Sequence, residues 1–356
     1  MSRPPTPLLG RPAAQSVRLI ALRYLDEGAA AADRLKDPED KEALHDFRVA
    51  LRRLRTTLRV YRPLLEGSVS RRLRRRLREV ADATNQARDA EVAVAWLRPL
   101  TEGFSARERF GLHWLVERIE RERAKDLPRT LAAARRSFAG AERKLRKGLE
   151  VYHRTVTVKG ATPEARFEAV ASAALLDQAK RLDQAIGSVE GPDDEAVHQS
   201  RIAAKRLRYQ LEPVADVLAG GADLVRRLRQ LQDLLGELHD LFELEDEVRT
   251  ALEAAAVARA GRLWELTLDD EPERHALRAA RRRRHNPGLF AVAQRSRARR
   301  AALFAQLKAD WMGKAEGWIH AIEAAIAPLV KRAREGPAKS STAVRATRRP
   351  GRAKTA

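Results

Sequence analysis

The sequence predicts an all-α protein made of two similar halves, each with four helices. Three observations predict this fold. Hydrophobic residues make up 44% of the 356-residue chain but aromatic residues only 5%, a composition that favours helical bundles over β-sandwiches or barrels. Apolar residues recur with helical spacing along most of the chain. One motif rich in histidine and arginine, HDFRVALRRLR at 45–55, recurs at 198–208, which indicates an internal duplication.

The helical pattern divides into two halves of four helices each. In the first half, 14–155, we expect helices at 14–36, 40–65, 69–98 and 106–148, the last bent near Pro128 because proline cannot donate a backbone hydrogen bond. The stretch VTVKGATP at 156–163 interrupts the pattern with β-branched residues, glycine and proline. In the second half, 164–330, we expect helices at 164–187, 193–218, 222–262 and 288–330.

The segments outside these helices are rich in charge or in proline. Residues 1–13 form a flexible lead-in, and 267–287 form an irregular or short-helical basic connection. Residues 331–356 contain nine lysines and arginines against one acid, so we expect a disordered basic tail. The folded domain that remains is 14–330.

Net charge is the strongest bulk signal. Lysine and arginine number 70 against 49 acidic residues, a formal net charge of +21, which favours polyanionic partners such as nucleic acid, an anionic membrane surface or inorganic polyphosphate. The absence of cysteine excludes disulfides, thiolate metal sites and cysteine nucleophiles. Charges interrupt every helix before about 18 apolar residues accumulate. We therefore expect a cytoplasmic protein without membrane insertion.

Each copy of the motif places a row of basic residues beside an apolar stripe, because residues three and four apart share one face of a helix. The stripe of the first copy is Leu44, Phe47, Leu51, Leu54, Leu58, Tyr61 and Leu65. The basic row beside it is His45, Arg48, Arg52, Arg55 and Arg59. The basic row of the second copy is His198, Arg201, Lys205 and Arg208. We call these two rows the ladders.

The ladders have the chemistry of an anion site. No acid interrupts their central turns, and like charges four residues apart destabilise a helix unless an anion offsets the repulsion. Arginine can hold two phosphate oxygens at once, lysine acts as a point charge, and histidine adds a further donor. The alternative is that these are solvated arginines on ordinary amphipathic helices. Two ladders of the same spacing, each led by a histidine, argue against it.

Other basic residues are candidate contacts of lower rank. Arg53 and Arg206 belong to the motif but point away from the ladders, so that they can instead contact the adjacent half. The next helix repeats as well, with LREVADATNQARD at 77–89 matching LRQLQDLLGELHD at 228–240. From this repeat we add Arg78, Arg88 and Arg229. We expect Asp89 and Asp240, which match one another, to orient an arginine or cap a turn.

The sequence lacks the usual patterns for catalysis or metal binding. The remaining histidines show no HxxxH or HExxH spacing, there is no GxxxxGK[ST] sequence, and no serine lies in a nucleophile elbow. No acid cluster that could hold a metal opposite the ladders is evident. We therefore expect no enzyme activity, no metal site and no cofactor.

The repeated motifs resemble those of the CHAD family, the conserved histidine α-helical domain. HDFRVALRRLR followed by NQARDAEV, and VHQSRIAAKRLRYQLE followed by LQDLLGELHD, are similar to the family's two signature blocks in order and spacing, over about 14–330. The resemblance implies two four-helix bundles related by pseudo-twofold symmetry, with a basic channel at their junction that binds inorganic polyphosphate. It implies contacts from the matching positions His45, Arg48, Arg52, Arg53, Arg55, His198, Arg201, Lys205, Arg206 and Arg208.

The sequence thus predicts noncatalytic binding of inorganic polyphosphate, which would target the protein to polyphosphate granules. Two alternatives stay open. A basic helical chain with a basic tail could also bind nucleic acid nonspecifically through its phosphates. An enzyme acting on phosphoanhydrides would need metal-holding acids that face the basic channel. The tunnel-type triphosphatase domain that often accompanies the family, with its alternating Glu/Lys strand motif, is missing.

Overall fold

The computed structural model describes residues 8–37, 39–40, 42–150, 165–192, 195–268, 284–312 and 315–335. Within these ranges it contains helices and no strand, so the predicted all-α class is confirmed. The first half contains α1 (Ala13–Arg34), α2 (Ala43–Val60), α3 (Arg71–Ala83), α4 (Asn85–Leu97) and α5 (Ala106–Glu150). The second half contains α6 (Phe167–Gly187), α7 (Glu195–Leu211), α8 (Gly221–Leu268), α10 (Asn286–Asp310) and α11 (Ala315–Glu335).

Two predicted helices are each divided in the structure. The prediction of one helix over 69–98 was wrong: α3 and α4 are separate, and between them Thr84 turns its hydroxyl to donate a 2.9 Å hydrogen bond to the Ala81 carbonyl. The prediction of one helix over 288–330 was also wrong, because the backbone leaves helical geometry at Trp311 between α10 and α11.

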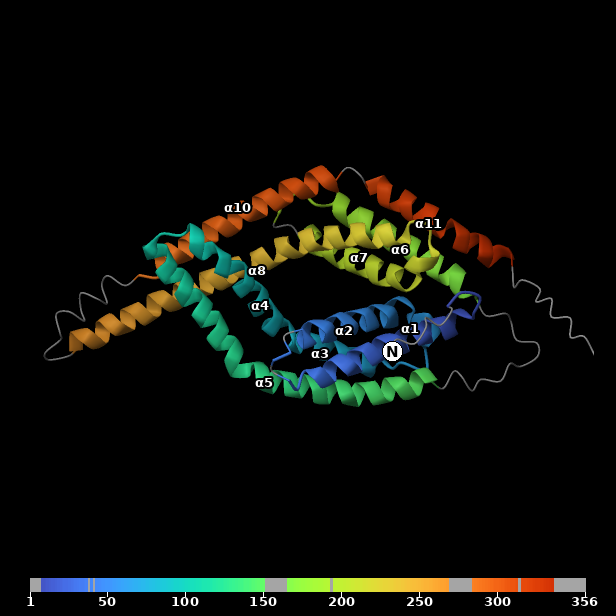
Figure 1. Cartoon of the computed structure of the whole chain (residues 1–356), viewed down its shortest axis with the longest axis horizontal. Helices are drawn as coiled ribbons and strands as arrows, with labels where there is room; N and C mark the ends of the chain where they lie inside the picture. Colours follow the sequence, from blue (N-terminus) through green and yellow to red (C-terminus); the bar gives the residue numbers. More distant parts are fainter. Residues whose placement is uncertain are drawn as a thin grey trace, which may run out of the picture.

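Prolines account for the ends of two other helices. Helices α2 and α7 stop earlier than the predicted spans 40–65 and 193–218, and each continues as a short 3₁₀ helix with Pro63 or Pro213 in its first turn. Helix α5 runs through Pro128 and changes direction near its middle, as predicted (Figure 1).

The predicted terminal and connecting segments lie mostly outside the described residues. This applies to 1–7, to 269–283 in the predicted basic connection, and to 336–356 in the predicted tail. Helix α8 continues beyond the predicted end at 262, and α11 continues into the region predicted as tail.

The helices form an elongated molecule with a body and an arm (Figure 1). In the body, α1 packs on α2 and α5, while in the second half α6 packs on α7 and α11. The arm consists of α4, the first part of α5, the last part of α8, and α10, with α10 lying against both α5 and α8. The arm therefore joins the two halves at one end of the molecule.

Equivalent segments of the two halves meet one another in the body. Helix α1 contacts α6, and α2 contacts α7. At the starts of α1 and α6, an antiparallel bridge pairs Pro12 with Arg166, with Ala13 N donating to Ala165 O at 2.8 Å and Phe167 N donating to Arg11 O at 3.1 Å. Contacts between like elements are what a twofold relation produces, although the pseudo-twofold duplication itself stays a prediction.

One continuous set of buried side chains runs through both halves. Phe47 of α2 and Phe138 of α5 pack edge to face with ring centroids 5.1 Å apart. In the second half, Trp311 and Trp318 stack at 5.6 Å, and the Arg227 guanidinium lies 4.8 Å from the Trp318 ring centroid. This packing holds α2 against α5 in the first half and joins the ends of α10 and α11 in the second.

The arm depends on a backbone-to-backbone helix crossing. A Cβ atom added at Gly288 of α10 would lie 2.2 Å from the Glu108 carbonyl oxygen and 2.7 Å from Gly111 Cα of α5. Only glycine permits this approach.

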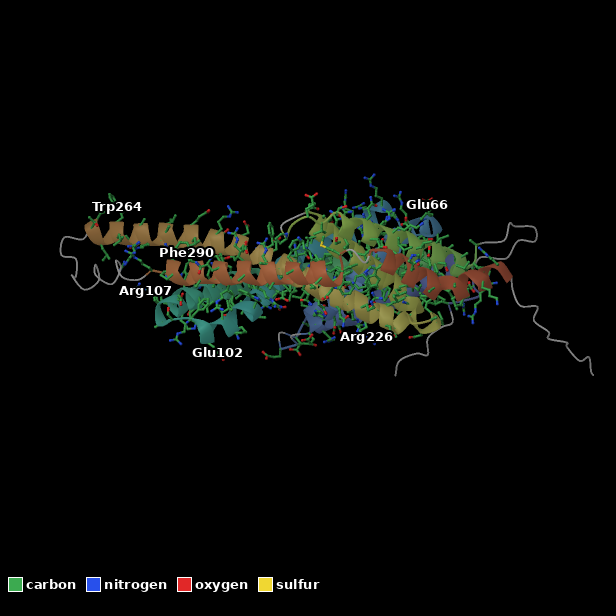
Figure 2. The ribbon with its side chains drawn as sticks, turned by 90° about the horizontal axis from the view of Figure 1, so that it is seen from above. Glu66, Glu102, Arg107, Arg226, Trp264 and Phe290 are labelled. Atoms are coloured by element: carbon green, nitrogen blue, oxygen red, sulfur yellow. The ribbon has the colours of Figure 1, made fainter. Side chains whose placement is uncertain are left out.

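Two large aromatic side chains, Trp264 and Phe290, lie exposed on the arm (Figure 2). None of the helices in the described ranges has the length and apolar character of a membrane-spanning segment.

Candidate functional site

Helix α2 carries the first ladder along the edge of its buried face. All residues of the predicted apolar stripe, from Leu44 to Leu65, are buried. Beside them Arg48, Arg52 and Arg55 are half-buried, whereas the two ends of the ladder are exposed. The middle of the ladder therefore lies where α2 meets neighbouring helices.

Helix α7 carries the second ladder in a more enclosed position. Its apolar stripe, from Val197 to Val214, is buried. Every member of its ladder, from His198 to Arg208, is half-buried, because α7 packs against α2, α6 and α8. Both ladders thus face the junction of the halves.

A cavity of about 350 Å³ at this junction is lined by both ladders. Helices α2 and α7 supply His45, Arg48, Arg52, Arg201 and Lys205. Helices α4 and α8 supply carboxylates, which we call the acidic wall: Asp89, Asp233, Glu237 and Asp240. The cavity therefore has a basic side contributed by the two motif helices and an acidic side contributed by the helices that follow them.

The cations on the basic side of the cavity are partly buried and lie close enough to one another to lower each other's pKa values. Burial, followed by the charges of Arg201 and Arg52, lowers the pKa of Lys205 to about 6, although Asp240 acts in the opposite direction. Burial also lowers the pKa of Arg201, with Arg52 adding to the effect and Asp240 opposing it. Repulsion and loss of hydration both act against the charged forms here, and a bound anion would reverse both effects.

The basic surface continues outside this cavity. Burial is the main cause of the lowered pKa of Arg55, and the charges of Arg78, Arg59 and Arg52 add to it against Asp82. Burial, then Arg59, lowers the pKa of Arg206 from the other half. Arg59 and Arg206 therefore approach one another across the junction, so that a row of cations leads from the cavity towards Arg206.

Two guanidinium groups of α7 present buried donors. Nε of Arg201 and Nε of Arg208 are buried and make no hydrogen bond within the described part of the chain. Arg201 Nη2 lies 3.9 Å from Asp240 Oδ1, and Arg208 Nη1 lies 3.2 Å from Glu212 Oε1. Buried donors without an acceptor are unfavourable, and phosphate oxygens are well suited to accept from them.

Arg53 is held by a carboxylate, Glu212, that it shares with Arg208. Arg53 Nε donates a 2.9 Å hydrogen bond to Glu212 Oε2, and Glu212 follows α7 in the other half. Its guanidinium also lies 5.8 Å from the Tyr24 ring centroid. The contact with the adjacent half that the helical geometry indicated is therefore present, and Arg53 is tied to a carboxylate.

Two candidates of lower rank receive less support. Arg229 is exposed on α8 and is not part of the cavity lining. The side chain of Arg88 lies outside the described residues.

Sequence reasoning did not assign a role to His239, which the structure brings to the site. Its ring centroid lies 5.3 Å from that of His198. Burial, followed by the charges of Arg201 and His198, lowers the pKa of His239 to about 4. His239 is therefore neutral at neutral pH. In the alignment of 77–89 with 228–240, His239 matches the candidate Arg88, and this match could have indicated His239 from the sequence.

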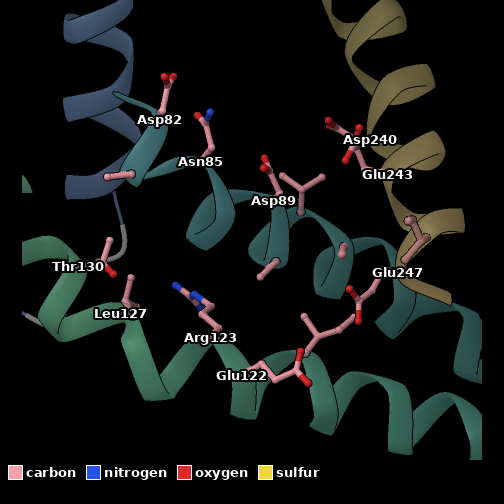
Figure 3. A pocket seen from close by; sticks show the side chains of 16 residues that line it. Asp82, Asn85, Asp89, Glu122, Arg123, Leu127, Thr130, Asp240, Glu243 and Glu247 are labelled. Carbon is pink, nitrogen blue, oxygen red and sulfur yellow. The ribbon is translucent and has the colours of Figure 1, made fainter. Parts of the chain in front are cut away.

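A second cavity of about 450 Å³ adjoins the first and shares Asp89 and Asp240 with it. Figure 3 shows Asp240, Glu243 and Glu247 on the side of α8 that faces α4, with Glu122 on α5 nearby. These acids are distant in sequence and meet only when α4, α5 and α8 pack, so sequence patterns did not indicate that they lie beside the basic cavity. No group of three metal-ligating side chains in the described ranges is placed to hold a metal ion.

The fold and site define an all-helical protein with a basic cavity between two halves. The sequence matches the family model of the CHAD domain over residues 19–249. The chain belongs to the CHAD family.

Two solved structures are similar to this chain. The crystal structure of the CHAD domain from the plant Ricinus communis aligns with a TM-score of 0.58 and 19% sequence identity, covering 91% of this chain and 98% of that one. PptA from Streptomyces chartreusis aligns with a TM-score of 0.48 and 16% identity, covering 81% of this chain and 100% of that one. The first likeness supports the fold. No match was found among curated protein sequences.

Proposed function

We propose that this protein binds inorganic polyphosphate without catalysis, in the cavity between its halves. The observation that carries the proposal is the convergence of Arg48 and Arg52 from α2 with Arg201 and Lys205 from α7 on one cavity. Positions 153 residues apart in sequence meet there, and a crowded set of cations in a partly dehydrated site is best stabilised by a multivalent oxyanion. Polyphosphate is the polyanion that the CHAD resemblance implies.

The charges also indicate a path for a long chain. The acidic wall and the second cavity repel phosphate on one side, whereas Arg55, Arg59 and Arg206 continue the positive surface on the other. A chain held in the cavity would therefore extend along Arg55 towards Arg59 and Arg206. In this arrangement Arg53 holds the two halves together through Glu212 and does not contact phosphate.

Charge reversal at the two facing ladder positions tests the proposal. We expect Arg52→Glu with Lys205→Glu to abolish binding of long-chain polyphosphate at physiological salt, measured by titration calorimetry, with the helical circular dichroism unchanged. The matched control is Arg226→Glu with Arg249→Glu, which makes the same charge change at exposed positions of α8. Retained binding in the ladder variant, or equal loss in the control, would contradict the cavity as the site.

Competition separates this proposal from nonspecific nucleic-acid binding. Counterion release makes any phosphate-chain binder sensitive to salt, so salt dependence alone does not discriminate. We expect long-chain polyphosphate to displace DNA and RNA from the full chain, and nucleic acid at the same phosphate concentration not to displace polyphosphate. Equal mutual displacement would favour the nucleic-acid function.

A phosphatase assay tests the noncatalytic part of the proposal. The carboxylates of the second cavity lie next to the basic cavity. Carboxylates beside a phosphate site are a general feature of enzymes that transfer phosphoryl groups with metal ions. We expect the pure protein to release no phosphate from polyphosphate with Mg²⁺ or Mn²⁺. Release that disappears in Asp89→Asn would establish an enzyme in place of a binding protein.

Targeting to polyphosphate granules would follow from binding. We expect the fluorescently tagged chain to collect on granules in cells that contain them, and the Arg52→Glu, Lys205→Glu variant to stay dispersed. Granule association of that variant would assign targeting to another part of the chain.

A further inference from the structure

The two half-sites differ at one pair of matching positions. Arg52 of α2 corresponds to Lys205 of α7 in the repeated motif, and both side chains line the same cavity. A guanidinium keeps its charge at any physiological pH, whereas a buried ammonium can lose its proton. The repeated motif therefore has a permanent cation at this position in one copy and a titratable cation in the other.

Cations surround Lys205 on its own helix and on the one facing it. Arg201 lies one turn before it on α7 and Arg208 one turn after, and Arg52 faces it from α2. His45 and Arg48 of α2 line the same cavity. These neighbours favour a neutral amine.

Helices α8 and α4 supply the groups that oppose or modify this effect. From α8, Asp240 favours the ammonium but is shared with Arg201, and His239 is neutral at neutral pH. Asp233 and Glu237 of α8 and Asp89 of α4 line the cavity further, and Glu237 is already held by Arg299 through hydrogen bonds of 2.6 and 2.9 Å. Lys205 itself makes no ion pair with a described carboxylate.

We propose that Lys205 is a proton-linked phosphate contact, which becomes an ammonium when a polyphosphate chain enters the cavity and releases the proton when the chain leaves. This inference rests on the proposed function and adds its regulation by pH. Phosphate oxygens between Lys205 and Arg52 would supply the negative charge that the shared Asp240 does not. The pKa of about 6 for Lys205 without ligand agrees with this placement.

The sign of the effect follows from linkage. A ligand that favours the protonated amine raises its pKa, so the ligand binds most tightly below pH 6 and progressively more weakly as pH rises through that value. The affinity should fall by at most about tenfold per pH unit, because one proton is involved. At pH 7.5, where the free amine is mostly neutral, binding should take up close to one proton.

Calorimetry in buffers of different ionisation enthalpy measures this uptake on the full chain with long-chain polyphosphate. We expect uptake near one proton for the wild type at pH 7.5 and a clearly smaller value for Lys205→Arg, which keeps the cation but fixes its charge. The histidines and the terminal phosphates are the same in both titrations, so the difference isolates Lys205. Equal uptake in the two proteins would overturn the inference.

The Lys205→Arg substitution could be uninformative if the larger side chain disturbs the cavity, so a second variant and a measurement without ligand complete the test. Lys205→Met should bind more weakly than the wild type at pH 6, and the difference should become smaller as pH rises to 8.5 and above. In the free wild type, the ¹³Cε resonance that is absent from Lys205→Met should titrate near pH 6. A resonance that titrates only above pH 9 would contradict the inference even if polyphosphate binds, whereas failure of the wild type to bind at pH 6 would instead reject the proposed function.

Discussion

At the scale of single residues, matching positions of the two motif copies have different surroundings. Arg53 is bonded to Glu212 across the junction, whereas its counterpart Arg206 has Arg59 and Arg181 as its charged neighbours. Arg52 and Lys205 differ in chemistry. The repeated motif determines the position of a side chain on its helix, but the residues of the facing helix determine what that side chain contacts.

Arg53→Ala should reduce stability more than binding. The side chains of Arg53 and Glu212 are 24% and 12% exposed, and removing one partner of a mostly buried ion pair destabilises by about 1–3 kcal/mol. Urea denaturation measures this loss. Arg206→Ala is the matched control and should change the unfolding free energy little while weakening polyphosphate binding. An unchanged urea midpoint for Arg53→Ala, together with a large loss of affinity, would assign Arg53 to the phosphate site after all.

Asp183→Asn should stabilise the protein at neutral pH. Asp183 is 6% exposed on α6, and burial raises its pKa to about 6 against the smaller effect of the Ile319 backbone N–H. Because the folded pKa is above the unfolded value of 3.8, stability falls as pH rises from 4 to 6. The variant should therefore gain about 1–3 kcal/mol at pH 7.5 and nothing at pH 4. Urea denaturation at the two pH values checks this, and an equal effect at both would exclude titration of Asp183 as the cause.

At the scale of helices, the sequence predicted positions well and breaks poorly. The repeat aligns Thr84 with Leu235, yet the first half breaks there and α8 runs through without interruption. Leu235 and Thr84 are both fully buried, but the Thr84 hydroxyl donates a hydrogen bond to the carbonyl of Ala81. The residues at these matched positions differ, and the Thr84 hydroxyl bonds to a helix carbonyl as the leucine side chain cannot, which favours the break. Proline explains the ends of α2 and α7, and there the sequence signal was available.

Gly288→Ala should weaken the arm. Its Cβ would lie 2.2 Å from the Glu108 carbonyl oxygen, so α10 must move away from α5, which we expect to lower the unfolding free energy by about 1–3 kcal/mol. Hydrogen exchange should quicken in α5 and α10 near the crossing. Gly261→Ala on α8 meets no atom within 4 Å and should be neutral or stabilise by up to about 1 kcal/mol. Equal effects of the two substitutions would show that helix propensity, not close packing, sets the response.

At the scale of the whole molecule, the positive and negative side chains are unevenly distributed, which the net charge alone does not show. The ladders could be found from the sequence because angular position beside an apolar stripe is a property of one helix. The acidic side could not, since Asp89, Glu122 and Asp240 belong to three helices that meet only after folding. A chain of net charge +21 therefore contains a junction with one positive and one negative side, and this polarity restricts where a polyanion can lie.

Asp89→Asn with Asp240→Asn tests whether that polarity opposes binding. If the acidic side mainly repels phosphate, the double variant should bind long-chain polyphosphate roughly threefold to tenfold more tightly, because two negative charges leave the cavity lining. Calorimetric titration at two salt concentrations measures the change, which salt should reduce only partly at a half-buried site. Asp223→Asn with Asp246→Asn gives the same change in net charge at exposed positions and should alter affinity much less. The sequence instead predicted that Asp89 and Asp240 orient an arginine or cap a turn. Weaker binding by the cavity variant would support that role, whereas equal gains in both variants would leave net charge as the only determinant.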